Sequence, residues 1–136
     1  MRFLLLALIL AVATGCAITQ KDNHEAAYGV WETAMKTYAE CMIITAKTYS
    51  ESEATAFEIA EAAQSKCGQQ FYTLERATLD YYLSNARGSY GRNLAIEASE
   101  RQIQKIKSDG KDTVVQEVIE YRLQKNPRPM PKVVQE

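Results

Sequence analysis

Cysteine is the residue type with the most chemical potential in this chain of 136 residues, and it occurs three times. A thiol can carry a lipid, oxidise to a disulfide, or lose its proton and bind a metal. The positions are Cys16, Cys41 and Cys67, with neither a Cys-x-x-Cys redox pair nor a cysteine–histidine metal pattern. The spacing therefore favours one role for Cys16 and a shared role for Cys41 and Cys67.

The residues before Cys16 indicate its role. Met1-Arg2 is followed by residues 3–13, which are all apolar. One basic residue and then about eleven apolar ones are typical of a secretory signal, whereas a membrane span needs about 20. The run continues into Ala13-Thr14-Gly15-Cys16, which resembles the lipobox of bacterial lipoproteins.

This resemblance implies a covalent anchor and a location. In bacterial lipoproteins the cysteine thiol receives a diacylglycerol, a peptidase cuts before the cysteine, and the new amine is acylated. It thus implies cleavage after Gly15 and attachment to a membrane through lipid on Cys16. Because Ala17 follows, and not the aspartate of inner-membrane retention signals, we expect a cell-envelope location at the outer membrane, facing the periplasm. The alternatives are an ordinary secretory signal and an uncleaved anchor helix.

Cys41 and Cys67 then remain as an even pair in an oxidising compartment, which predicts a disulfide. The bridge would close a loop and, by the chain-entropy model, stabilise the folded state by about 3–4 kcal/mol. The midpoint between them is residue 54, just past the segment 50–53, in which Ser50 and Glu53 have the spacing of a capping box. In an antiparallel helical hairpin that turns there, the two cysteines would face each other.

Residues suited to catalysis are few. His24 is the only histidine and lies in a polar stretch, so we interpret it as a solvated linker residue. Glu58 and Glu61 have i, i+3 spacing and could perform acid–base chemistry on sugars, but glycosidases need a deep cleft. We interpret the two glutamates as a solvated helix face. The sequence therefore predicts no enzyme, no cofactor and no metal site, and a cell-wall hydrolase is the least favoured alternative.

The pattern along the chain predicts an all-α fold. Apolar side chains recur at steps of three and four over residues 26–49, 52–66, 69–86, 93–107 and 113–125, and no stretch alternates as a strand does. Gly68 is expected to cap the second helix, residues 88–91 to form a kink or break, and residues 108–110 to end the fourth helix. We expect a disulfide-linked antiparallel helical hairpin, extended by further helices into a small bundle.

The predicted organisation has four parts. They are a signal peptide (1–15), a lipidated tether (16–25), a helical domain (26–125) and an extended tail with three prolines (126–136). The tail is either a polyproline-type ligand or a disordered terminus. A net charge of −1 argues against nucleic acid as a partner. Trp31, Cys41 and an alanine-rich hairpin closed by Cys67 also resemble uncharacterised small helical bacterial proteins, a resemblance that implies no activity.

Aromatic and methionine side chains on the first helix form the candidate partner or ligand surface. They are Trp31, Tyr38, Met42 and Tyr49. Such residues are enriched at protein interfaces, although tyrosines also span the boundary of a core. The first hypothesis is a non-enzymatic, membrane-anchored interaction or accessory protein with a protein partner in the envelope. The second is a binder of a small apolar ligand, held between helices in a cavity lined by tyrosine and methionine.

Overall fold

The computed structural model describes residues 2–126, and it describes side chains from residue 22 onward. The helices are α1 (Arg2–Tyr49), α2 (Ala56–Lys66), α3 (Gly68–Ser84) and α4 (Gly88–Lys125). No strand occurs in residues 2–126, so the predicted all-α class is confirmed. The side chains of the predicted signal peptide and of Cys16, and the tail over residues 127–136, lie outside what the structure describes.

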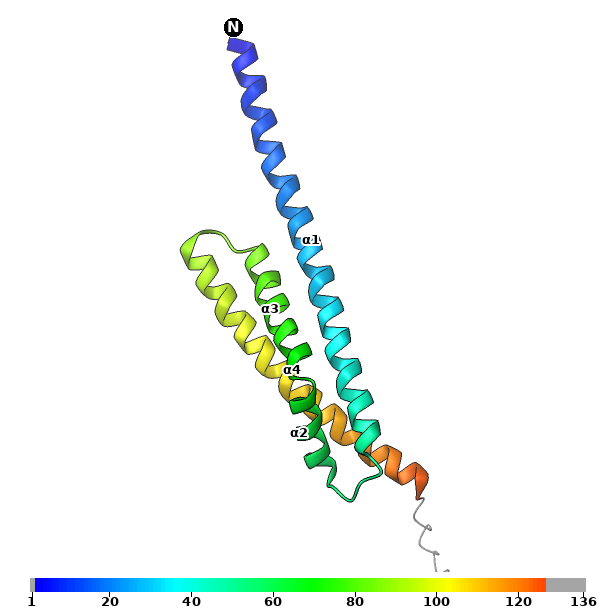
Figure 1. Cartoon of the computed structure of the whole chain (residues 1–136). Coiled ribbons are helices and arrows are strands. Elements are labelled where there is room, and N and C mark those ends of the chain that lie inside the picture. Colours follow the sequence, from blue (N-terminus) through cyan, green and yellow to red (C-terminus); the bar gives the residue numbers. More distant parts are fainter. Residues whose placement is uncertain (1, 127–136) are drawn as a thin grey trace, which may run out of the picture.

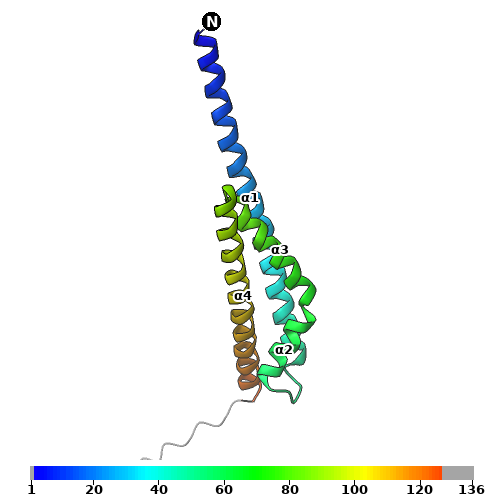
Figure 2. The same cartoon turned by 90° about the vertical axis from the view of Figure 1, so that its left-hand side faces the viewer.

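The helices form an elongated bundle. α2 and α3 follow each other end to end and run back alongside α1, and α4 then returns along α3, α2 and α1 (Figure 1). The view turned by 90° shows that the first turns of α1 extend beyond the bundle (Figure 2). α1 is continuous across residues 16–25, the predicted tether.

The disulfide fixes the hairpin at its middle. Cys41 of α1 and Cys67 at the α2–α3 junction are bonded, with their Cα atoms 5.9 Å apart. Cys67 has no exposed surface, and neither have Ala60 and Ala63 of α2. Small side chains there let α2 pack closely against its neighbours. The predicted disulfide-linked antiparallel helical hairpin is therefore confirmed.

All four helices contribute to one hydrophobic core. Its larger side chains are Tyr38 and Met42 of α1, Ile59 of α2, Leu74 of α3, and Ile103, Ile106, Val114 and Val118 of α4. The buried Thr78 satisfies its hydroxyl by donating to the Leu74 carbonyl oxygen at 2.7 Å. The core runs along the bundle axis, so each helix keeps one face for solvent or for a partner.

The start of α2 corrects one sequence prediction. The capping box is formed by Thr55 and Glu58, not by Ser50 and Glu53. The Thr55 N–H donates to Glu58 Oε2 at 2.7 Å, and the Glu58 N–H donates to Thr55 Oγ1 at 3.2 Å. Both segments have capping-box spacing. Because α2 begins at residue 56, the preceding residues form a loop that α4 can contact.

Three predictions that rested on glycine positions are also wrong. Gly68 does not cap α2, because Cys67 ends that helix and Gly68 begins α3. The break lies at residues 85–87, just before the predicted 88–91, and α4 starts at Gly88 with a positive φ of 65°. Residues 108–110 do not end a helix, since α4 continues to Lys125 and Gly110 packs there against Tyr38. Tertiary packing along α4 outweighs the weak helix propensity of Gly110.

Candidate functional site

One face of α1 leaves apolar side chains in solvent. Val30 is 62% exposed and Ile44 is 65% exposed, with the exposed Thr37 midway between them. Steps of seven residues return to nearly the same side of a helix, so the three form a line that we call the α1 stripe. This line is distinct from the core-facing line that contains Tyr38 and Met42.

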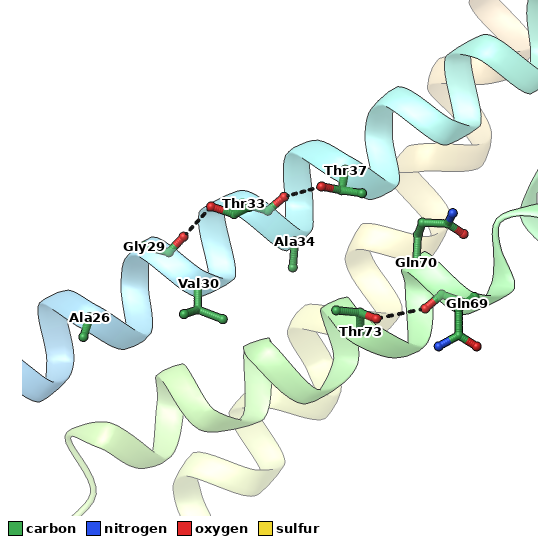
Figure 3. Close-up of a pocket in the computed structure, with 9 residues that line it drawn as sticks. All are labelled: Ala26, Gly29, Val30, Thr33, Ala34, Thr37, Gln69, Gln70 and Thr73. Atoms are coloured by element: carbon green, nitrogen blue, oxygen red, sulfur yellow. Dashed lines mark hydrogen bonds between the residues drawn. The ribbon is translucent and has the colours of Figure 1, made fainter.

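The α1 stripe borders a groove between α1 and α3, here called the α1–α3 groove (Figure 3). Its volume is about 590 Å³ and it is open to solvent. Its lining residues are mostly small: Ala26, Gly29, Val30, Thr33, Ala34 and Thr37 from α1, and Gln69, Gln70 and Thr73 from α3. Val30 and Ala34 point from α1 toward α3 in Figure 3.

The threonines make this groove less polar than its composition suggests. Thr33 Oγ1 donates to the Gly29 carbonyl at 2.8 Å, and Thr37 Oγ1 donates to the Thr33 carbonyl at 2.9 Å. Across the groove, Thr73 Oγ1 donates to the Gln69 carbonyl at 3.1 Å, and all three bonds are drawn in Figure 3. Because each hydroxyl is directed to its own helix, the methyl groups remain for a partner.

A carbonyl without a partner lies at the base of the same groove. Among the described residues, two buried side-chain polar atoms have no hydrogen-bond partner, Gln70 Oε1 and Trp31 Nε1. Figure 3 shows Gln70 rising from α3 on the side of α1.

A second, smaller groove lies between α1 and α4. It has a volume of about 260 Å³, and Met35, Tyr38 and Met42 line it from α1. Ile106 and Val114 line it from α4. Burial raises the pKa of the Tyr38 phenol above its ordinary value, and a hydrogen bond with Gln64 acts in the opposite direction. The ring therefore stays neutral and part of the core.

Of the four residues of the predicted surface, only Tyr38 and Met42 come together, in the α1–α4 groove. Tyr38 and Met42 are 2% exposed and belong to the core, while Tyr49 is 40% exposed at the far end of α1. Trp31 stacks on Tyr81 of α3, with the ring centroids 5.5 Å apart. Sequence reasoning grouped these residues by type and missed the α1 stripe. The seven-residue spacing of Val30, Thr37 and Ile44 places them on one line of α1, but Trp31 and Tyr38 of the core line have the same spacing, so spacing alone does not show which line is exposed.

His24 is not the solvated linker residue that the sequence predicted. Its Nδ1 lies 2.8 Å from Ser84 Oγ, and Asn85 Nδ2 lies 3.0 Å from the same nitrogen. The imidazole also stacks on Tyr81, with the centroids 5.0 Å apart. These contacts attach α1 to the C-terminal end of α3. The role follows from tertiary position, which a polar local sequence does not reveal.

The two glutamates considered for acid–base chemistry have structural partners. Glu58 closes the capping box, where the bonds from Thr55 lower the pKa of its carboxyl. Glu61 accepts a hydrogen bond from Lys111 Nζ at 2.8 Å, linking α2 to α4. Within the described part of the chain, no three histidine, cysteine, aspartate or glutamate residues group as metal ligands would.

Two further findings concern the chain as a whole. None of the helices in the described part of the chain has the length and apolar character required to cross a membrane. Comparison with protein-family models, with curated proteins and with solved structures gives no match.

Proposed function

We propose that this protein is a membrane-anchored lipoprotein of the cell envelope that acts as a non-enzymatic accessory protein, and that it binds a helix of an envelope protein along α1. The observation that carries the binding part is the α1 stripe beside the α1–α3 groove. The anchoring part rests on the sequence alone, on the resemblance of residues 13–16 to a lipobox.

The shape of the surface supports a helical partner. The α1–α3 groove follows α1 from Ala26 to Thr37, which is about three turns, or roughly 16 Å. Small residues such as Gly29, Thr33 and Ala34 permit close approach of a second backbone, and Val30 and Ile44 supply apolar contacts beside it. In helix-in-groove binding, an amphipathic helix lays its apolar face into such a groove.

The alternative function is binding of a small apolar ligand between α1 and α4. The observation that favours it is the lining of that groove by Met35, Tyr38 and Met42. Its volume of about 260 Å³ is below the usual range for ligand pockets, about 300–1,000 Å³. The larger and more exposed α1–α3 groove is therefore the better supported site.

The anchor is tested by intact mass spectrometry of the protein purified from membranes. We expect a mass that begins at Cys16 and includes acyl chains, and Cys41 and Cys67 unreactive to alkylation until reduced. A mass that retains Met1, or that begins after Cys16 without lipid, would refute the anchor.

The binding surface is tested by photo-cross-linking in cells. A benzophenone amino acid replaces Val30 or Ile44, and the matched control replaces Ile119, an apolar residue of α4 that is 47% exposed. We expect adducts from Val30 and Ile44 to one partner, mapping to positions on a single helix of that partner. Val30→Glu should abolish the Ile44 adduct, whereas Ile119→Glu should not. Equal labelling from all three positions would refute the surface.

A further inference from the structure

The turn between α3 and α4 is held close to the expected lipid site. His24 of α1 contacts Ser84, the last residue of α3, and Asn85, the first residue of that turn. Cys16 precedes His24 by about two turns of the continuous helix α1, which is about 12 Å along its axis. If lipid holds Cys16 in a bilayer, the α3–α4 turn is the part of the bundle nearest to that bilayer (Figure 1).

The side chains at this end have the chemistry of a membrane interface. Tyr90 is 76% exposed, the highest fraction among the large hydrophobic residues described, and Leu94 is 46% exposed one turn later on the same side of α4. Tyrosine rings favour the level of the lipid headgroups, where one end of the ring is apolar and the other is hydrated. Neither side chain contributes to the core.

The charge of the turn points the same way. Residues 83–96 contain Arg87 and Arg92 and no aspartate or glutamate. The described acidic side chains in the adjoining turns are Asp22 and Glu25 of α1, Asp80 of α3 and Glu97 of α4. The segment that carries Tyr90 is thus basic, and Glu97, the first acidic residue after it on α4, pairs with Arg101.

We propose that the α3–α4 end of the bundle, through Tyr90, Leu94 and Arg92, rests on the surface of the bilayer that holds Cys16. This inference depends on the proposed lipid anchor. It adds an orientation, in which the bundle meets the membrane by one end and leaves the α1 stripe free for a partner. Two attachments, one covalent and one peripheral, limit the rotation of the bundle about the tether.

Lipid photo-cross-linking of the full lipidated protein tests the orientation. A benzophenone amino acid replaces Tyr90 or, as the matched control, Tyr72, which is 53% exposed near the start of α3. Each protein is reconstituted into vesicles of phosphatidylethanolamine and phosphatidylglycerol and irradiated. We expect at least fivefold more lipid adduct from position 90 than from position 72. Arg92→Glu should lower the yield at position 90 several-fold, since basic side chains near anionic lipid contribute to binding.

The outcomes separate this inference from the anchor. Acyl mass on Cys16 with equal lipid adducts at positions 90 and 72 overturns the orientation alone. Protein adducts in place of lipid adducts at position 90 also overturn it, because that end would then be a protein interface. Absence of acyl mass on Cys16 overturns both the anchor and the orientation.

Discussion

Arg122 of α4 donates a hydrogen bond from Nε to the backbone carbonyl oxygen of Ser50 at 2.9 Å. Its Nη2 donates to the carbonyls of Ser52, at 2.9 Å, and of Ala54, at 2.7 Å. A single guanidinium thus satisfies three carbonyls of the α1–α2 loop. Beside it, the bond from Lys125, and less strongly that from Tyr121, lower the pKa of the Glu51 carboxyl. The end of α4 fixes the loop that positions the hairpin.

Arg122→Met should lower the free energy of unfolding by about 2 kcal/mol, because charge-assisted bonds to three carbonyls are lost together. Urea unfolding followed by circular dichroism measures the change. The control is Arg101→Met on the same helix, where the exposed pair with Glu97 is worth at most about 0.5 kcal/mol. Similar effects of the two substitutions would contradict a special role for Arg122.

Reduction of the Cys41–Cys67 bond should cost about 3–4 kcal/mol, the chain-entropy value for a separation of 26 residues. The double variant Cys41→Ala/Cys67→Ala should lose somewhat more, since the fully buried Cys67 side chain is also truncated. Urea unfolding of the oxidised, reduced and double-variant proteins separates the two effects. An unchanged urea midpoint after reduction would show that the bridge does not stabilise the fold by restricting the unfolded chain.

Much of the fold could be predicted because its signals are local and repeated. Apolar periodicity located the helices, and the turn expected at residues 50–53, just before the midpoint of Cys41 and Cys67, let the two cysteines meet. Helix boundaries were less accurate, since Ser50–Glu53 and Thr55–Glu58 have the same capping spacing. What selects Thr55 is tertiary: Arg122 holds residues 50–54 as a loop.

The candidate surface could not be predicted from residue type. Tyr38 is aromatic and Met42 is flexible, as interface residues often are, yet both are buried in the core. Val30 and Ile44 are ordinary core residues by type, yet no helix of the bundle covers them. Which line of α1 becomes buried depends on how α3 and α4 pack against it. The packing of the whole bundle determines which line of α1 is buried, and the sequence of α1 alone does not.

Ala63→Leu should destabilise the fold by about 1–3 kcal/mol, because Ala63 has no exposed surface and a larger side chain forces its neighbours apart. Ala62→Leu is the matched control, one residue away on the exposed side of α2. It should change stability by less than about 0.5 kcal/mol. Thermal unfolding of both variants measures the difference, and equal melting temperatures would contradict close packing at α2.

The capping box predicts a specific pH dependence. Bonds from the Thr55 N–H and hydroxyl lower the pKa of the Glu58 carboxyl, so its stabilising contribution is present above the ordinary value of 4.5 and is lost as the pH falls below it. Glu58→Gln keeps an acceptor but removes the charge. Its melting temperature should lie below that of the wild type at pH 7, and the gap should close toward pH about 3.

Melting temperatures followed by circular dichroism over this pH range provide the measurement. Thr55→Ala removes the hydroxyl donor but keeps the backbone donor, so it should show a smaller pH dependence than the wild type. A gap between wild type and Glu58→Gln that stays constant with pH would rule out the carboxylate as its source.

Gly88 and Gly91 should respond to alanine with opposite signs. Gly88 has a φ of 65°, a region that costs a side-chain-bearing residue about 1–2 kcal/mol, so Gly88→Ala should destabilise by about that amount. A Cβ on Gly91 would meet only ordinary contact, 3.7 Å from the Ala86 carbonyl carbon, so Gly91→Ala should stabilise α4 by about 0.5–1 kcal/mol. Urea unfolding of the two variants tests this. Two changes of the same sign would contradict the positive φ at the start of α4.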